Sequence, residues 1–321
     1  MRAVDSLQVV FLVDNTTDSL SSTPRFVETE FASHRRRKMP WLSGKCLCCA
    51  AHGLSCLITA RSETASRTLL FDTGPDEVVF ERNATRLGVP LGNVEALVLS
   101  HGHWDHGGAM PRALQMIAMS GGVMPVPTFM HPDMFALRAT KGHDGHMRPM
   151  ELVPSADVLR GNGAEVIITR DEQVLCGGAF YISDEIPRVT AFETGFPGQC
   201  RQSAEGGWEP DEIMPDERFV AAHVAGKGLA VFTACSHAGL VNVLSHAKAR
   251  FPDIPLYAVF GGFHLSGPTE AIIPATIAAL APFDLTLIAP GHCTGWRALT
   301  ALVNAFGERV VPTAVGKTFT L

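Results

Sequence analysis

Three histidines and one aspartate lie within six consecutive residues, 101–106, which read His-Gly-His-Trp-Asp-His. In an extended loop, side chains two residues apart point the same way, so His101, His103 and Asp105 can face one centre. His106 then turns toward that centre or toward a second one. Imidazole nitrogens and carboxylate oxygens are ligands of Zn²⁺ and similar metals, so this run predicts a metal site. The plainer alternative is a polar loop that is merely rich in histidine, which so dense a run of ligands disfavours.

Three more histidines follow apolar segments in the second half of the chain, namely His237, His264 and His292. Each has a glycine within two residues, which lets the backbone bend sharply. Because ligands bind at the carboxyl ends of the strands of an α/β sheet, we expect these three loops and the 101–106 run to meet there. His264 could contact substrate or metal, or it could be a packed, hydrogen-bonded histidine.

The segments that must position these loops alternate between strand and helix patterns. Apolar runs bounded by turn residues predict strands over residues 7–13, 54–60, 68–71, 94–99, 126–130, 165–169, 188–192, 219–224, 229–233, 255–260 and 285–289. Helical spacing and end signals predict helices over residues 76–87, 111–119 and 240–250, after Pro268, and up to about Phe306. The alternation favours an α/β fold.

The chain has 321 residues, of which 46% are apolar and 18% charged, a composition typical of a folded globular protein. Its formal net charge of −6 argues against a nucleic-acid binder, which needs a basic surface. No stretch predicts a membrane span or a signal peptide. The eight cysteines show no regular disulfide framework, so we expect a reducing, cytoplasmic location. We expect one domain over residues 1–321, made of similar halves at about 1–160 and 161–321.

Three polar or cysteine-rich segments carry weaker signals. The stretch at about 20–45 predicts a surface insertion, and its basic run, 35–38, is expected to be a solvated loop. The Cys-Leu-Cys-Cys group at 46–49 could suggest a zinc knuckle, but no second paired set has the right spacing, so we expect buried thiols. His143 and His146 lie in a polar loop that could cover the site or stay in solvent.

The 101–106 run resembles the hallmark of the metallo-β-lactamase superfamily, His-x-His-x-Asp-His after a buried strand. Residues 70–74, Leu-Phe-Asp-Thr-Gly, resemble the superfamily's upstream Asp-Thr-Gly turn, and Gly291-His292 resembles its late histidine ligand. The resemblance implies an α/β fold, an αββα sandwich of two mixed sheets flanked by helices, with the site at one edge. It also implies that Asp72 supports a ligand or the loop, as carboxylates near metal-bound histidines do.

Four further segments narrow this resemblance. They are residues 50–55 (Ala-Ala-His-Gly-Leu-Ser), 234–239 (Ala-Cys-Ser-His-Ala-Gly), 261–265 (Gly-Gly-Phe-His-Leu) and 291–295 (Gly-His-Cys-Thr-Gly). They resemble the branch named for 7,8-dihydropterin-6-methyl-4-(ribofuranosyl)aminobenzene 5'-phosphate synthase. The chain departs from that branch at Ala51, where a glutamate is expected.

The resemblance implies two metal ions, with Zn²⁺ expected and Mn²⁺ or Fe acceptable to the same ligand types. The expected ligands are His101, His103 and His237 for the first metal, and Asp105, His106 and His292 for the second. Cys235 stands near the place of the superfamily's bridging aspartate, and it could ligate as a thiolate or be a small buried residue. Without that carboxylate, a bridging water or hydroxide would hold the metal pair. The superfamily's usual mid-chain Gly-His ligand is not evident in this sequence.

Other side chains are expected around this centre. The candidate catalytic residues are Asp105 and His264, and the candidates for supporting ligands or contacting substrate are Asp72, His52, Cys235, Arg188 and Trp104. Arg188 and the loop 194–198 could bind an anionic group, and Trp104 and Trp208 could stack on a planar ring. His131 is expected to support the site from outside at most.

These expectations favour an enzyme, a metallohydrolase with a dinuclear metal site. In it, a metal-bound water or hydroxide would attack an ester, lactone or phosphoester. One alternative is a synthase like that of the dihydropterin branch, with the metals as Lewis acids. Another is a metal-containing ligand sensor without turnover, because one fold hosts many functions. The expected partner is a small molecule, anionic or pterin-like, with no nucleic acid and no membrane, and no oligomeric state is assigned.

Overall fold

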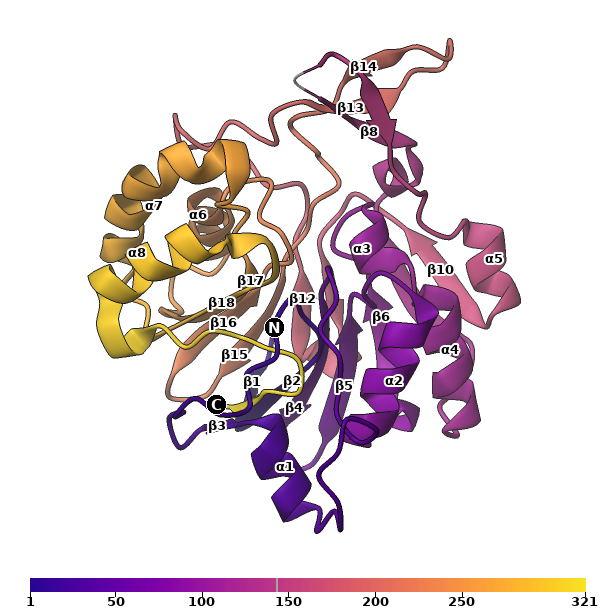
Figure 1. The fold of residues 1–321 in the computed structure, drawn as a ribbon, viewed down its shortest axis with the longest axis vertical. Helices are drawn as coiled ribbons and strands as arrows, with labels where there is room; N and C mark the ends of the chain where they lie inside the picture. The colour runs from indigo at the N-terminus through magenta and orange to yellow at the C-terminus, as the bar shows by residue number, and fades with distance from the viewer. Residues whose placement is uncertain (143) are drawn as a thin grey trace.

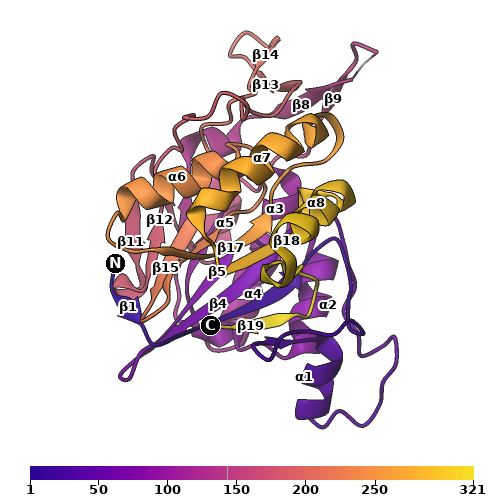
Figure 2. The same ribbon diagram turned by 90° about the vertical axis from the view of Figure 1, so that its left-hand side faces the viewer.

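Two mixed β-sheets face each other through the middle of the protein, and helices cover the outer face of each (Figure 1). The computed structural model describes residues 1–142 and 144–321, so the prediction for His143 lies outside the described residues. The arrangement confirms the α/β class and the αββα sandwich of two mixed sheets expected from the sequence. Figure 2, turned by 90°, shows the helices of the C-terminal half lying in front of their sheet.

The larger sheet has eight strands, mostly from the N-terminal half. They are β2 (Ser6–Val13), β3 (Val27–Glu28), β4 (Ser55–Arg61), β5 (Ser66–Phe71), β6 (Val94–Val98), β7 (Val126–Met130), β10 (Ala164–Ile168) and β19 (Thr318–Thr320). Their order across the sheet is β10-β7-β6-β5-β4-β2-β19-β3. The helices of this half are α1 (Glu30–Arg36), α2 (Glu77–Leu87), α3 (Trp104–Gly107), α4 (Met110–Met119) and α5 (Ala156–Gly161). The side chain of Asp76 caps α2, and Gly88 ends it in a left-handed conformation, as the sequence signals predict.

The second sheet has seven strands. They are β1 (Ala3–Val4), β11 (Gln173–Leu175), β12 (Phe180–Ile182), β15 (Val220–Val224), β16 (Gly228–Phe232), β17 (Leu256–Gly262) and β18 (Leu287–Gly291). Their order is β11-β12-β15-β16-β17-β18, with β1 beside β15. Its covering helices are α6 (Leu240–Arg250), α7 (Ile273–Leu280) and α8 (Trp296–Phe306). Short 3₁₀ turns complete the fold at η1 (Leu91–Asn93), η2 (Pro132–Phe135), η3 (Cys176–Gly178), η4 (Gly267–Ile272), η5 (Ala281–Phe283), η6 (His292–Thr294) and η7 (Gly307–Arg309).

A small antiparallel sheet projects from one end of the molecule (Figure 1). Its strands are β8 (Arg138–Lys141), β9 (Met147–Pro149), β13 (Gln199–Gln202) and β14 (Trp208–Pro210). The sequence patterns predict none of these strands. They also predict a strand over 188–192, which is wrong, because this segment forms an irregular loop. The backbone N–H groups of Val189 and Thr190 donate to the side chain of Asn242 on α6, at 2.9 Å each, instead of joining a sheet.

Aromatic side chains fill the space between the two large sheets. Phe260 on β17 stacks on Phe232 of β16, with ring centroids 5.0 Å apart. It also meets Phe319 of β19 edge-on at 5.2 Å, and it lies 6.4 Å from Phe11 of β2. Because Phe11 and Phe319 belong to the larger sheet, this cluster joins the two sheets. One further apolar cluster lies under the helices of the N-terminal half, and another lies under those of the C-terminal half.

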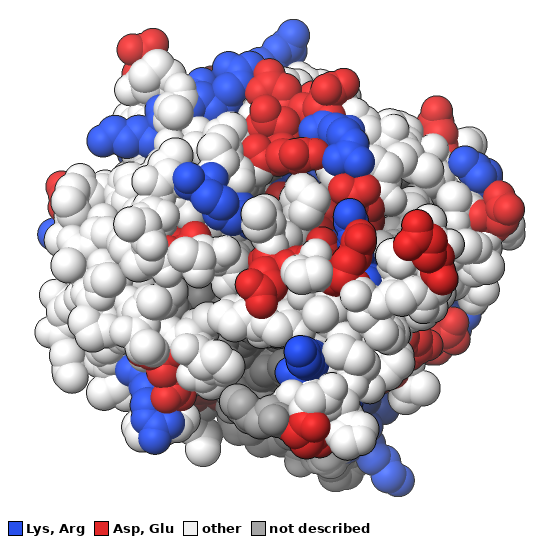
Figure 3. All heavy atoms as spheres, turned by 90° about the horizontal axis from the view of Figure 1, so that it is seen from above, with Lys and Arg blue, Asp and Glu red and all other residues white. Residues whose placement is uncertain are grey.

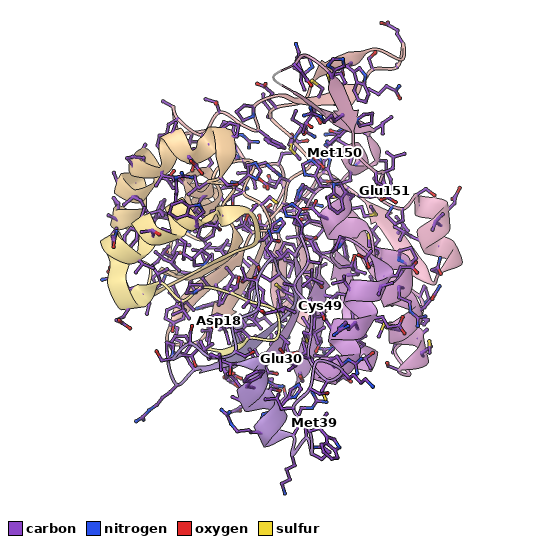
Figure 4. The ribbon with its side chains drawn as sticks, in the orientation of Figure 1. Asp18, Glu30, Met39, Cys49, Met150 and Glu151 are labelled. Carbon is purple, nitrogen blue, oxygen red and sulfur yellow. The ribbon has the colours of Figure 1, made fainter. Side chains whose placement is uncertain are left out.

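The segment 20–45 is more ordered than a solvated loop. It contains β3, which pairs with β19, and α1, whose N-terminus is capped by Thr29. The expected loop over the basic run 35–38 is therefore wrong for Arg35 and Arg36, which lie on α1. Glu30, at the start of α1, is labelled in Figure 4.

Acidic and basic side chains lie close together on the surface of the small-sheet end (Figure 3). Among the described residues, no helix is both long enough and apolar enough to cross a membrane. All eight cysteines are free thiols.

Candidate metal centre

The histidine loops follow directly from the carboxyl ends of β6, β16, β17 and β18 and meet at one edge of the sandwich. Some residues of these loops, and Asp72 after β5, have a left-handed backbone conformation that residues other than glycine rarely adopt. Positive φ angles occur at Asp72 (56°), Ser236 (60°), His264 (40°) and His292 (44°). Such conformations persist where surrounding structure holds a side chain in a required place, and they cluster at functional sites.

Three buried imidazoles form the first group, His101, His103 and His237. One ligand atom from each lies within 4.8 Å of the others, and Nε2 of His101 is 3.0 Å from Nδ1 of His103. Burial lowers the pKa of all three rings, that of His103 to about 3. The rings are therefore neutral near pH 7, and neutral imidazole is the form that ligates metals.

The second group consists of Asp105, His106 and His292. Oδ2 of Asp105 lies 3.6 Å from Nε2 of His106 and 3.4 Å from Nε2 of His292. Two ligand atoms on a tetrahedral Zn²⁺ lie about 3.3 Å apart, so each of these pairs has a suitable spacing. Asp105 and His292 form a group of mutually close ligand atoms with His52, whereas His106 forms one with His101 and Cys235.

Burial opposes ionisation of Asp105, but His106 and His292 outweigh it and hold the Asp105 pKa well below its usual range. Asp105 is therefore ionised. Burial opposes a charge on His106 as well, but Asp105 and Asp72 raise the pKa of that ring to about 9, so a metal that binds there must displace a proton from His106.

Cys235 lies between the two groups. Its Sγ is 3.2 Å from Nε2 of His106 and within 4.8 Å of a ligand atom of His101, of His237 and of His292. Burial raises the pKa of this thiol well above its ordinary value, so a nearby cation is needed to stabilise the thiolate. This thiol is therefore in contact with side chains of both groups.

Asp72 contacts one ring of the second group directly and one ring of the first group through Ser100. It accepts hydrogen bonds from the backbone N–H and the hydroxyl of Ser100, at 2.7 and 2.8 Å, and pairs with Nδ1 of His106 at 2.7 Å. Oγ of Ser100 in turn lies 2.9 Å from Nδ1 of His101. Contacts of this kind fix the tautomer and the orientation of a metal-binding ring.

Two supporting side chains escape the sequence analysis. Oδ1 of Asn15 lies 2.9 Å from Nδ1 of His292, and Nε2 of Gln199 lies 3.1 Å from Nε2 of His103. Asn15 follows the end of β2 at the same sheet edge, which is a signal that could have found it. Gln199 lies on β13 of the small sheet, where no sequence pattern indicates a role.

Several buried nitrogens at this edge have no hydrogen-bond partner among the described residues. They are both ring nitrogens of His237, Nδ1 of His264 and Nε2 of His292. Leaving a buried polar group unpaired costs about 1–3 kcal/mol, so such atoms normally have a partner. Nε2 of His292 has Oδ2 of Asp105 3.4 Å away but no hydrogen bond, and a cation would give these nitrogens a partner. The mixture of imidazole, carboxylate and thiol donors is that of Zn²⁺ sites, and the residues therefore fit a metal centre.

A cavity of about 330 Å³ opens beside the two groups. Apolar side chains form part of its wall, namely Trp104, Met150 and Phe196. The Phe196 ring stacks on His237, with centroids 4.8 Å apart, and Met150 lies just below the small sheet (Figure 4). His264 also lines the cavity.

The remaining candidates occupy different places. The exposed His52 lines the cavity, and its Nε2 is 3.4 Å from Oδ2 of Asp105. Arg188 does not line the cavity, because its guanidinium donates to the backbone carbonyls of Ile186 and Ile213. Trp208 lies on β14 of the small sheet and is not among the described cavity-lining residues.

Two other expectations concern residues away from the cavity. His131 is buried, and its Nε2 lies 3.2 Å from Oε1 of Glu185 rather than near the ligand groups. The cysteines at 46–49 do not join any group of three metal-ligating side chains among the described residues. Within this group Cys48 is buried, whereas Cys46 and Cys49 are partly exposed.

Comparisons with known proteins show which fold and which relatives this chain resembles. The sequence pattern of the Metallo-beta-lactamase superfamily matches residues 55–175. A crystal structure of a metal-dependent hydrolase of the beta-lactamase superfamily superimposes with a TM-score of 0.70 over 98% of each chain, at 20% sequence identity. The protein therefore has the metallo-β-lactamase fold, and its resemblance to that superfamily is confirmed.

Two curated relatives from Methanocaldococcus jannaschii narrow the resemblance. A 7,8-dihydropterin-6-methyl-4-(beta-D-ribofuranosyl)-aminobenzene-5'-phosphate synthase is 29% identical over 259 residues, covering 80% of this chain and 85% of the relative. An uncharacterized protein is 29% identical over 257 residues, covering 79% of this chain and 88% of the relative. The predicted resemblance to the branch named for that synthase is thus confirmed.

Proposed function

We propose that this protein is a dinuclear metal-dependent hydrolase that cleaves an ester, lactone or phosphoester bond in a small molecule. The observation that carries the proposal is a set of buried ligand side chains around the Cys235 thiol, including the His101, His103 and His237 group, beside a cavity of about 330 Å³. His101, His103 and His237 would hold one metal, and Asp105, His106 and His292 the other. Cys235 would be shared between them. Zn²⁺ bound there would supply Lewis acidity, which polarises a substrate oxygen and lowers the pKa of water.

The side chains around the cavity support roles in binding and proton transfer. Trp104 and Phe196 offer aromatic surface to the apolar part of a substrate. His264 is the candidate proton donor to the leaving group, because it lines the cavity 4.4 Å, ring centroid to centroid, from His237. Asp105, which belongs to the second ligand group, would orient the reacting part of the substrate.

Hydrolysis is tested with p-nitrophenyl phosphodiesters, lactones and thioesters in the presence of Zn²⁺ or Mn²⁺. We expect turnover of at least one substrate class, abolished in His103→Ala and retained in His131→Ala. The control is matched, because His131 is also a buried histidine that follows a strand. Full activity in His103→Ala, or a purified protein that takes up no metal, contradicts the proposal.

A second candidate function is a synthesis of the kind for which the M. jannaschii relative is named. The observation that favours it is the 29% identity to that synthase, which extends over 80% of this chain. In this case the metals would act as Lewis acids in bond formation. Formation of the product in the relative's name, detected by mass spectrometry from an activated 6-methyl-dihydropterin and the aminobenzene ribofuranosyl phosphate, would favour this candidate. Turnover confined to the hydrolysis panel would exclude it.

A further inference from the structure

Three consecutive charged residues, Asp216, Glu217 and Arg218, are buried beneath the metal centre just before β15. Their exposed fractions are 0%, 1% and 1%. Charged residues are almost never fully buried unless their charges are paired or hydrogen-bonded. The segment forms hydrogen bonds to two of the loops that carry proposed metal ligands.

Asp216 and Arg218 contact the loop that carries the first ligand run. Oδ2 of Asp216 accepts the backbone N–H of Gly102 at 2.8 Å, and the backbone N–H of Arg218 donates to the carbonyl of Ser100 at 2.9 Å. The guanidinium of the buried Arg138 pairs with Asp216 at 2.6 Å and donates to the Gly102 carbonyl at 3.2 Å. This side of the segment therefore fixes the backbone on both sides of His101.

Glu217 contacts the loop that carries the other half of the first ligand group. Its two carboxylate oxygens accept the backbone N–H groups of His237, at 2.8 Å, and of Ala238, at 2.5 Å. These two hydrogen bonds fix the main chain of this loop at two successive residues. Glu217 thus anchors the main chain at His237 itself.

This anchor matters because His237 lacks the support that the neighbouring rings have. Ser100, Gln199 and Asn15 contact ring nitrogens of other proposed ligands. Both ring nitrogens of His237 lack a partner among the described residues, and its side chain is held by stacking on Phe196. Stacking fixes the plane of a ring but not its position within that plane. The position of the His237 nitrogens therefore depends on where its backbone is held.

We propose that Glu217 is the positioning residue of the first metal group, which it sets through the backbone of His237 rather than through the ring. The inference rests on the proposed metal-dependent function. In most metal sites a carboxylate orients a histidine by accepting its second ring N–H. Here Glu217 binds the backbone N–H of His237 instead, and both ring nitrogens remain without a hydrogen-bond partner among the described residues.

The chain offers a matched control in Glu193. This carboxylate is also buried, at 3% exposure, and it accepts two backbone N–H groups, those of Val241 and Asn242, at 2.8 Å each. Glu193 therefore binds the first turn of α6 and Glu217 binds the loop just before it, and only Glu217 binds the backbone of a proposed ligand. Glu193→Gln removes the same chemistry without touching His237.

The test compares Zn²⁺ titrations against a chromophoric chelator, and Co²⁺ absorption spectra, for wild type, Glu217→Gln and Glu193→Gln. We expect two equivalents in wild type and Glu193→Gln, and a loss of about 10- to 100-fold in affinity for one equivalent in Glu217→Gln, the range seen for residues that orient ligands. The Co²⁺ spectrum of Glu217→Gln alone should change. Thermal unfolding of both variants reports the structural cost that they share. If Glu217→Gln does not fold, Glu217→Asp and Glu193→Asp replace the pair.

Two outcomes would overturn the inference. Equal metal affinity and spectra in the two variants, with two equivalents in wild type, contradict the role of Glu217 and leave the proposed function standing. Wild-type protein that binds no metal contradicts the proposed function, and this inference with it.

Discussion

His131 and His237 are both buried histidines, yet their ring nitrogens have different surroundings. His131 has Glu185 at 3.2 Å from one nitrogen and accepts the backbone N–H of Asp133 at the other, also at 3.2 Å. His237 has no partner at either nitrogen among the described residues. A buried ring whose nitrogens have no hydrogen-bond partner in the folded chain is suited to bind a metal ion or another group that is not part of the chain. This difference between single residues supports the proposed metal centre more directly than the number of histidines does.

The role of Cys235 can be tested through the protons that metal binding releases. Cys235→Ser is expected to release one proton fewer on Zn²⁺ binding and to weaken the metal pair, because a thiol must lose its proton to ligate. Calorimetry in buffers of different ionisation enthalpy measures the proton count. Cys56→Ser is the control, since Cys56 is a buried thiol on β4 that belongs to no group of metal-ligating side chains among the described residues. An unchanged count in Cys235→Ser contradicts its assignment as a shared ligand.

The support given by Asp72 predicts a large stability effect. Asp72→Ala leaves the N–H and hydroxyl of Ser100 and Nδ1 of His106 without their acceptor in a buried site. Removing one partner of a buried charged pair costs about 3–5 kcal/mol, which urea unfolding of metal-free protein would detect. Asp76→Ala, which removes only the cap of α2, should cost about 1 kcal/mol. Similar costs for the two variants would show that Asp72 does not hold the site together.

Sequence reasoning finds residues of this site when their chemistry is local. The 101–106 run could be recognised because its ligands are adjacent in the chain. Asn15 and His292 lie 277 positions apart and Gln199 and His103 lie 96 apart, so no local pattern pairs them. Glu217 is harder still to find, because its contact with His237 is made to the backbone, which has no side-chain signature.

At the scale of elements, long periodic segments were predictable and short ones were not. The strands that precede the histidine loops are apolar runs, and the structure confirms β6, β16, β17 and β18. The small sheet of β8, β9, β13 and β14 has strands of three or four residues, too short to show a period. The predicted strand at 188–192 fails because Asn242, distant in sequence, satisfies its N–H groups.

The aromatic cluster between the sheets predicts which element contact stabilises the sandwich. Phe260→Ala should cost about 3–5 kcal/mol, the usual range for a buried phenylalanine, because it leaves a cavity between β17 and β19. Denaturant unfolding measures the change. Val78→Ala on α2 is the control, since that side chain is 76% exposed, and we expect a change within about 0.5 kcal/mol. A cost near that of the control would mean that the sheets do not depend on this contact.

At the scale of the whole molecule, each proposed metal takes ligands from both halves of the chain. The first half contributes the 101–106 run and the second contributes His237 and His292. Side chains that are far apart in the sequence therefore meet at this edge of the sandwich. Metal bound there would act as a cross-link between segments that otherwise meet through the apolar core.

Metal removal should accordingly lower the stability of the whole fold. A ligand present at 100 times its Kd stabilises the native state by about 2.7 kcal/mol for each site. Scanning calorimetry with Zn²⁺ and with a chelator should therefore show a Tm lower by several degrees in the chelated protein. His103→Ala should lose most of this difference. An identical Tm in wild type with and without metal would contradict the cross-linking role.

The most direct measurement of the central claim is a crystal structure of the Zn²⁺-loaded protein, with anomalous scattering recorded at the zinc absorption edge. The account predicts two anomalous peaks, one among His101, His103 and His237 and the other among Asp105, His106 and His292, with Sγ of Cys235 between them. The absence of a peak at this edge of the sandwich, or zinc bound only elsewhere on the protein, would contradict it.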